Sequence, residues 1–293
     1  GFLGAGLMSA VTYLGNTVAA QLGALVLIWL AAEWLTGYLR VSAPSIVLSV
    51  LFTGFTAYYM AAVLGAPRWS NLAIYETFMI VSAAALVAAG LFYLRFRLPF
   101  ALAIVGLTIV GLAFTAIGTL SSDFLVSNFR LIVGGGGLSL FTAAMWFDLK
   151  DPLRKSTRSD CGFWLHLIAA PMLTHAVLWD SHPAITNMQK MLGTTPALNS
   201  WLIIAAFFVL FGIIALIINR RALLVSSLGY VGSVIAYGIW QLNLPSGAAT
   251  SVVLLIIAAL ILTFGVGWQP LRRLVFKLMP RGKYLDNLPP AHV

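Results

Sequence analysis

The chain has 293 residues, of which 61% are hydrophobic and only 9% are charged. A soluble domain averages roughly 45–50% apolar and about 25% charged residues, so this composition excludes an ordinary water-soluble globule. The net charge of +9 does not indicate nucleic-acid binding, because no basic stripe mixes with aromatic residues. The single cysteine, Cys161, excludes a disulfide framework and a cysteine-based metal site.

Long apolar segments follow one another along the chain, separated by short polar or Pro/Gly-containing breaks. An α-helix needs about 20 mostly apolar residues to cross a bilayer. The predicted spans are Thr12 to Thr36, Ser45 to Leu64, Ile74 to Leu94, Ala101 to Leu120, Phe129 to Asp148, Cys161 to Trp179, Trp201 to Asn219, Ala222 to Gln241 and Ser251 to Trp268. The sequence therefore predicts an all-α fold, a polytopic transmembrane helix bundle of about nine spanning helices.

The first span is interpreted as a retained helix. The chain begins at Gly1 rather than Met, so we expect a segment upstream of it. No charged region followed by a short apolar run marks a signal peptide. The apolar stretch from Gly1 to Met8 leaves open a further helix that begins upstream.

Positive charges sort to one side of this predicted bundle. Every Lys and Arg except Arg68, Arg130 and Lys190 falls in alternate loops or in the tail after the ninth span. Cytoplasmic loops of membrane proteins carry an excess of Lys and Arg. We therefore predict that the basic side is cytoplasmic and that it includes the C-terminus.

The tail begins as a basic amphipathic segment. Apolar residues recur at helical spacing with cations between them: Leu271, Arg272, Arg273, Leu274, Val275, Lys277 and Leu278. Such a stripe is suited to lying on an anionic membrane surface, and a docking surface for a partner is the alternative. Residues 1–269 are thus predicted to form the transmembrane bundle, and residues 270–293 a cytoplasmic interfacial helix with a short tail.

A polar site is predicted at the outer half of the fifth and sixth spans. Four consecutive glycines favour an unwound turn, because each costs about 1 kcal/mol of helix propensity relative to Ala. Proline interrupts the sixth span, and broken helices in transporters often frame a substrate or ion site. The candidate pathway residues are Glu76, Arg130, Gly134, Gly135, Gly136, Gly137, Pro171 and His175. Close helix packing at the glycines and a structural proline kink are the competing interpretation.

A second polar network is predicted near the cytoplasmic boundary. Its candidate members are Glu33, Asp148, Arg158, Asp160 and His166. Solvated salt bridges are the ordinary explanation of such a charged loop. We expect no metal site, because His166 and His175 are half a turn out of phase on a straight helix. No cofactor motif and no catalytic motif is present, so no catalytic residue is predicted.

Two patches carry a family resemblance. Residues 158–175, which begin RSDCGFWLHLIAAP, resemble a segment of an uncharacterised family of bacterial multi-pass inner-membrane proteins, and so does the C-terminal patch 267–290, which begins GWQPLRR. The resemblance implies the bacterial inner (cytoplasmic) membrane as the setting. It implies no activity, but it directs attention to Arg158, Asp160, His166, Pro171 and His175.

The sequence allows three functions. A small-solute or ion transporter or channel predicts a water-filled cavity near Glu76, Arg130 or His175. A structural or accessory subunit of a membrane complex predicts a closely packed, dry bundle. A lipid-modifying enzyme predicts clustered acid, base or metal groups at one leaflet, and the sequence lacks them. The lipid bilayer is the expected partner, a homo-oligomer or a membrane-complex partner stays open, and nucleic acid is not expected.

Overall fold

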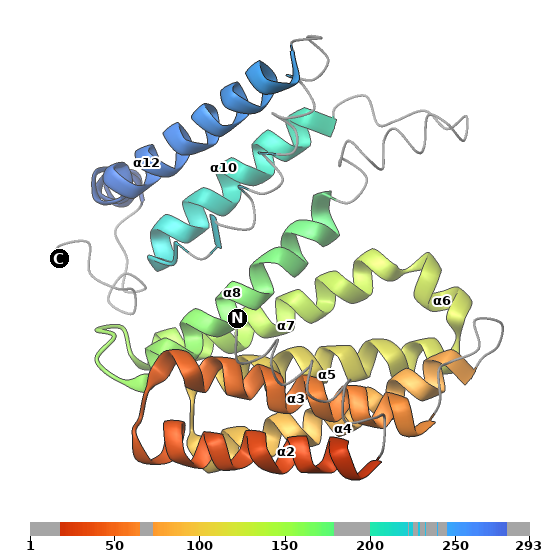
Figure 1. Cartoon of the computed structure of the whole chain (residues 1–293). Coiled ribbons are helices and arrows are strands. Elements are labelled where there is room, and N and C mark those ends of the chain that lie inside the picture. The colour runs from red at the N-terminus through yellow and green to blue at the C-terminus, as the bar shows by residue number, and fades with distance from the viewer. Residues whose placement is uncertain are drawn as a thin grey trace. The chain divides into compact units, whose positions relative to one another are not determined.

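The computed structural model describes residues 18–64, 73–178, 200–221 and 245–279, with Leu223, Leu224, Leu228, Gly232 and Ile239 between the last two ranges. The elements in these ranges are all helices, and the described residues contain no β-strand (Figure 1). The predicted all-α class is thereby confirmed. The chain forms two compact units, Gly1–Phe129 and Arg130–Val293.

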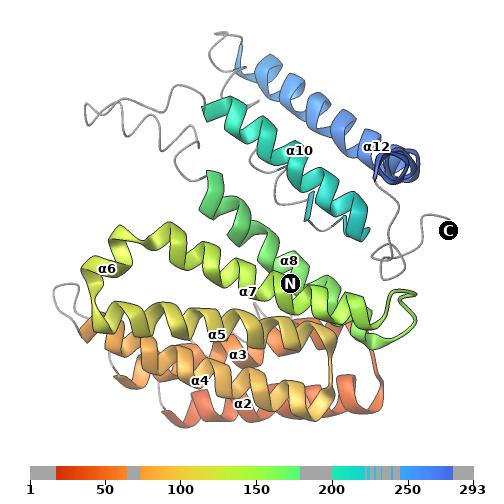
Figure 2. The ribbon, with the colours of Figure 1, turned by 180° about the vertical axis from the view of Figure 1, so that it is seen from behind.

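The first unit is a set of helices that pack in chain order. Its described elements are α2 (Val18–Ala32), the π-helix η1 (Glu33–Tyr38), α3 (Ser42–Leu64), α4 (Ala73–Phe96), α5 (Pro99–Leu120) and the short α6 (Ser122–Ser127). Figures 1 and 2 show α2, α3, α4 and α5 lying side by side. Short connections favour this arrangement, because consecutive apolar helices can then bury their facing stripes against one another.

Aromatic rings fill the centre of the first unit. The Trp29 ring lies 5.1 Å from the Phe52 ring and 5.5 Å from the Phe96 ring, centroid to centroid. Ile28 and Phe92 complete this core and are almost fully buried. Tilted and edge-on aromatic pairs of this kind each add about 0.5–1.5 kcal/mol beyond the burial of their area.

In its described residues, the second unit contains four long helices. They are α7 (Phe129–Lys150), α8 (Thr157–Leu178), α10 (Ser200–Ile218) and α12 (Ser246–Leu278). The less exposed side chains of α12 recur every three or four residues, from Val253 through Ile257, Leu260 and Phe264 to the buried Trp268. Side chains at this spacing form one stripe of an α-helix, and Trp268 joins the core with Phe211 and Leu216 of α10.

Six of the helices in the described ranges are long and apolar enough to cross a membrane. They are Ala20–Tyr38, Ser42–Leu64, Ile74–Phe96, Pro99–Leu120, Phe129–Lys150 and Gly247–Leu278. The predicted sixth and seventh spans coincide with α8 and α10, which are helical but are not among the six. Of the predicted eighth span, 222–241, the five described residues are helical and the rest lies outside the described residues. The total of about nine spans and the cytoplasmic C-terminus stay predictions.

The predicted interfacial segment is the last part of α12. The helix continues through Pro270 to Leu278 instead of ending near residue 269. Figures 1 and 2 show its last turns leaving the axis of the preceding part. Proline removes one backbone hydrogen bond and its ring presses on the carbonyl four residues earlier, so it bends a helix without necessarily ending it.

Candidate functional site

The four glycines of α7 do not unwind it. The helix is continuous from Phe129 to Lys150, so the predicted unwound turn at Gly134–Gly137 was wrong. A Cβ atom added at Gly137 would lie 3.0 Å from the Cβ of Met172 and 3.1 Å from the backbone nitrogen of Leu173. The absence of side chains therefore lets α8 approach the α7 backbone closely. Packing of this kind offsets the poor helix propensity of glycine.

Pro171 likewise leaves α8 unbroken. The helix runs from Thr157 to Leu178, although the proline removes one backbone donor in its middle. The neighbouring Ala169 and Ala170 are fully buried, so close contact on this side holds the helix together. The prediction of two broken helices is corrected for α7 and α8 alike.

Two glycines of the run are expected to respond to substitution with opposite signs. Gly137→Ala should destabilise the second unit by about 1–3 kcal/mol, because the new Cβ collides with α8. Gly135→Ala should stabilise it by up to about 1 kcal/mol, because nothing lies within 4 Å of its Cβ position and Ala favours the helix. Thermal unfolding of the purified variants in one detergent measures both effects. Equal shifts would contradict the packing role.

The candidate outer residues are divided between the two units. Arg130 donates from Nε to the carbonyl of Ala176 at 3.2 Å, and so caps the last turn of α8. His175 precedes Ala176 on α8 and is partly buried. Glu76 belongs to the first unit, where it is exposed in the first turn of α4. The contact with Ala176 is a structural role for Arg130. The predicted outer pathway stays a prediction.

A buried charged cluster lies at the end of α7, around the carboxylate of Asp148. Arg220 donates from Nε to Oδ2 at 3.0 Å and forms a second, shorter contact with Oδ1. The Nε2 atom of His166 lies 3.1 Å from Oδ2. Arg220 also donates to the carbonyl of Ser159 at 2.8 Å. Asp148, Ser159, His166 and Arg220, hereafter the charged cluster, are each 6% exposed or less.

The sequence of α8 makes room for this cluster. Ser159, Gly162 and His166 recur at i, i+3 and i+7, so they lie on one face of the helix. Gly162 stands opposite the carboxylate, since a Cβ there would be 2.5 Å from Oδ1 of Asp148. The missing side chain is therefore what allows Asp148 and Arg220 to meet beside α8.

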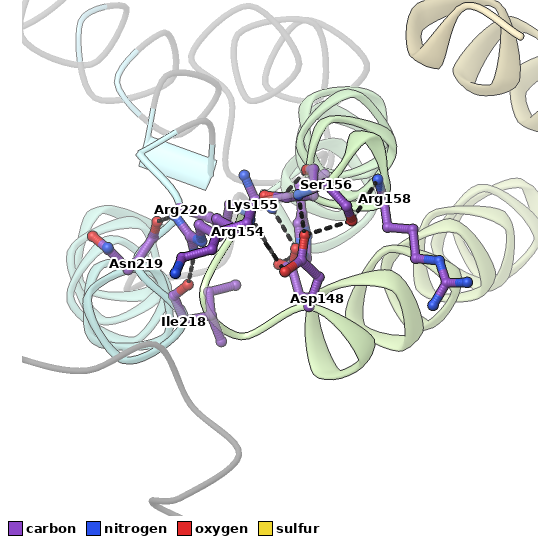
Figure 3. A network of polar contacts seen from close by, with 11 residues as sticks. Asp148, Arg154, Lys155, Ser156, Arg158, Ile218, Asn219 and Arg220 are labelled. Atoms are coloured by element: carbon purple, nitrogen blue, oxygen red, sulfur yellow. Dashed lines mark hydrogen bonds and ion pairs between the residues drawn. The ribbon is translucent and has the colours of Figure 1, made fainter.

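Arginines also cap the end of α10. Arg154 donates to the carbonyls of Ile218 at 2.6 Å and Asn219 at 2.8 Å, as Figure 3 shows. Arg272 of α12 donates from Nε to the carbonyl of Leu216 at 3.0 Å. The last carbonyls of a helix lack partners within it and carry partial negative charge, so cations stabilise them. Burial, followed by repulsion from Arg220, lowers the pKa of Arg154 to about 10, which keeps it charged at neutral pH.

The loop between α7 and α8 holds Arg154 in position. Asp151 accepts hydrogen bonds from the backbone nitrogens of Lys155 at 3.2 Å and Ser156 at 2.8 Å, and from the Ser156 hydroxyl at 2.7 Å. The bonds from Ser156 hold the pKa of the Asp151 carboxyl below its usual range. Ser156 in turn accepts from the backbone nitrogen of Arg158 at 3.3 Å, as an N-cap residue does.

The predicted inner network is therefore brought together in part. Asp148 and His166 are in contact, whereas the side chains of Arg158 and Asp160 are exposed. Glu33 lies in the first unit and pairs with Arg95 through two hydrogen bonds of 2.8 and 2.6 Å. Sequence reasoning missed Arg220, Ser159, Arg154 and Gly162 as partners. The spacing of Ser159, Gly162 and His166 on one helix face was a usable signal, but nothing local connects Asp148 to a residue 72 positions away.

The chemistry available to the charged cluster is proton exchange. A carboxylate and an imidazole 3.1 Å apart can share or transfer a proton, and the Nδ1 atom of His166 is buried without a hydrogen-bond partner. Within the described ranges, no group of three or more His, Cys, Asp or Glu side chains is placed to hold a metal ion.

The first unit offers a different kind of surface. A groove of about 590 Å³ runs between α2, α3 and α4, and Thr56 carries the one side-chain oxygen among the residues that line it. The Thr56 hydroxyl donates to the carbonyl of Phe52 at 2.8 Å, so it is already satisfied. Such a lining suits hydrocarbon and does not suit an ion or a polar solute.

Comparisons of the chain with protein-family models, with curated proteins and with solved structures found no match. Its class therefore rests on the fold and the site. The apolar helices define a multi-pass membrane protein, and its second unit carries a buried charged cluster at one end.

Proposed function

We propose that this protein is a small-solute or ion transporter of the bacterial inner membrane, in which the charged cluster is a proton-exchanging gate. The burial of Asp148, His166 and Arg220 together supports this proposal. Ionisable side chains in membrane-crossing helices are costly, and they usually mark pathways or proton relays. Asp148 lies within the candidate span Phe129–Lys150.

The charged cluster joins three parts of the second unit, and these parts would separate if the cluster opened. Asp148 belongs to α7, His166 to α8, and Arg220 follows α10. Proton transfer to Asp148 neutralises the carboxylate that holds Arg220, so the attraction between α7 and the end of α10 falls. Deprotonation restores it. A proton exchanged through His166 would thus be linked to opening and closing at this end of the unit.

The charge distribution supports a location for the gate at the cytoplasmic side. Lys150, Arg154, Lys155 and Arg158 flank the cluster, and the positive-inside bias of membrane proteins supports a cytoplasmic location for it. The resemblance of residues 158–175 to bacterial inner-membrane proteins supports the same setting. The gate would then control access from the cytoplasm.

Transport is tested with the purified full chain in proteoliposomes on a solid-supported membrane. Amino acids, organic acids, sugars and inorganic ions are applied in turn, with and without a pH gradient. We expect a current for at least one class, and we expect His166→Ala and Asp148→Asn to abolish its dependence on the pH gradient. Asp160→Asn, which changes an exposed acid on the same helix as His166, is the matched control and should keep the current and its dependence on the pH gradient. A folded protein that gives no current with any class would refute the proposal.

A non-catalytic accessory subunit of a membrane complex is the second candidate. The contact of α7 with α8 at Gly134 and Gly137 favours it, because a closely packed pair leaves no room for solute there. Extraction from native membranes into polymer nanodiscs, followed by native mass spectrometry, tests this function. A second chain at fixed stoichiometry would support it, and the chain alone, in one or several copies, would contradict it.

A further inference from the structure

The end of α12, from Trp268 to Leu278, has two faces with different environments. Trp268 and Arg272 are each 1% exposed and point into the unit, with Leu271 and Val275 beside them. The other face is open. It carries two exposed cations and two exposed leucines: Arg273, Leu274, Lys277 and Leu278.

The open face changes character along the helix. Before Pro270 its exposed large side chains are apolar, as at Leu254, Leu262 and Val266, whereas Arg273 and Lys277 follow the proline. A helix of 33 residues is about 50 Å long, and the hydrocarbon core of a bilayer is about 30 Å thick. The apolar part fills the core, so the basic end reaches the headgroup layer. The bend at Pro270 then allows the leucines to dip into the surface while the cations meet headgroups.

The buried face of the same segment contacts the end of α10. Arg272 donates to the carbonyl of Leu216 at 3.0 Å, and the indole Nε1 of Trp268 donates to Oδ1 of Asn219 at 2.8 Å. The guanidinium of Arg221 lies 5.3 Å from the centre of the Trp268 ring. Asn219 and Arg221 flank Arg220, the cation of the charged cluster. One short helical segment therefore touches both the open surface and the residues that position Arg220.

We propose that anionic phospholipid headgroups bind Arg273 and Lys277 and thereby hold Arg272 and Trp268 against the end of α10, so that anionic lipid stabilises the charged cluster. Anionic headgroups are the proposed ligand because their negative charge is complementary to the positive charge of this face. This inference goes beyond the proposed transport and does not depend on it. An acidic segment of a partner protein would need the same cations, and the experiment separates the two because it contains only the chain and lipid.

Lipid binding is measured on the full chain by native mass spectrometry from nanodiscs that contain phosphatidylglycerol and phosphatidylcholine. Arg273 and Lys277 lie one turn apart on α12, so both can contact one bound headgroup. Each is expected to contribute about five-fold in affinity at such a site, so Arg273→Gln with Lys277→Gln should weaken binding of phosphatidylglycerol roughly 25-fold. Arg40→Gln with Arg97→Gln removes two exposed cations of the first unit and is the matched control. It should retain the preference. Equal loss in both double variants, or no loss in the first, would overturn the lipid site.

Coupling to the cluster is measured by amide hydrogen exchange of the wild-type chain in the same nanodiscs. Phosphatidylglycerol should slow exchange around residues 216–221, and the effect should disappear in the Arg273→Gln, Lys277→Gln variant. Lipid binding without any change in exchange there would overturn the coupling. Neither lipid binding nor amide hydrogen exchange requires the chain to transport a solute. A chain that does not transport would therefore refute the proposed function without contradicting this inference.

Discussion

Replacing Asp148 with Asn is expected to destabilise the second unit by about 3–5 kcal/mol, because Arg220 then keeps its charge in a buried place without a carboxylate. The amide cannot accept the bidentate hydrogen bonds of the guanidinium, since it offers one acceptor oxygen and one donor group. His166 loses its charged partner as well. The loss falls on α7, α8 and the end of α10 together.

The chain carries its own reporter for this prediction. Cys161 is the one cysteine in the sequence, and its thiol is buried on α8 beside Gly162. A thiol-reactive fluorophore therefore reports opening of α8 next to the charged cluster. We expect Asp148→Asn to lower the midpoint of thermal unfolding and to speed the labelling of Cys161 in detergent. Labelling as slow as in the wild-type protein would contradict the structural account of the cluster.

Two further variants separate a buried charge from a general loss of packing. Asp160→Asn changes an exposed acid in the first turn of α8 and should cost at most about 1 kcal/mol through the helix dipole. Asp148→Leu combined with Arg220→Met removes both charges and should be more stable than Asp148→Asn alone, because no unpaired ion remains buried. A double variant that is less stable than Asp148→Asn would show that the charges themselves are not the source of the effect.

Gly162→Ala is expected to destabilise the second unit by about 1–3 kcal/mol, although alanine is the better helix former. The new Cβ would lie 2.5 Å from Oδ1 of Asp148 and 3.3 Å from the carbonyl of Ala144. The carboxylate cannot swing away freely, because Arg220 holds both of its oxygens. Either the ion pair loosens or α8 moves away from α7.

Thermal unfolding and Cys161 labelling measure this effect too. Gly135→Ala, on the open side of α7, is the control and should shift the unfolding midpoint in the opposite direction. The cost of Gly162→Ala should shrink in an Asp148→Ala background, where the obstructing carboxylate is gone. A cost that is the same in both backgrounds would assign the effect to backbone packing and not to the charged cluster.

Sequence reasoning succeeded where a property belongs to one continuous segment. The predicted spans Ser45 to Leu64, Ala101 to Leu120 and Phe129 to Asp148 agree with α3, α5 and α7 within three residues at each end. Hydropathy over about 20 residues, and the Pro, Gly and charged residues that separate apolar segments, are local properties. Helix bounds can therefore be predicted from them without coordinates. The same reasoning identified Asp148 and His166 as members of one polar region.

Sequence reasoning failed where one segment allows two structures and only its neighbours in the fold decide between them. Gly134–Gly137 allows both an unwound turn and a close helix contact, and the presence of Met172 and Leu173 against Gly137 decides for the contact. Propensity gave the wrong result there because packing contributes more free energy than the propensity of a few residues.

The amino-acid sequence alone determined that this is a helical membrane protein, because the length and apolarity of its segments leave lipid as their solvent. Only the tertiary structure decided which charges meet. Arg220 reaches Asp148 across 72 positions, and Arg272 reaches the end of α10 across 56. Such pairs depend on the rotation of each helix, and one residue of shift turns a side chain by about 100°, so no pattern within a single segment specifies them.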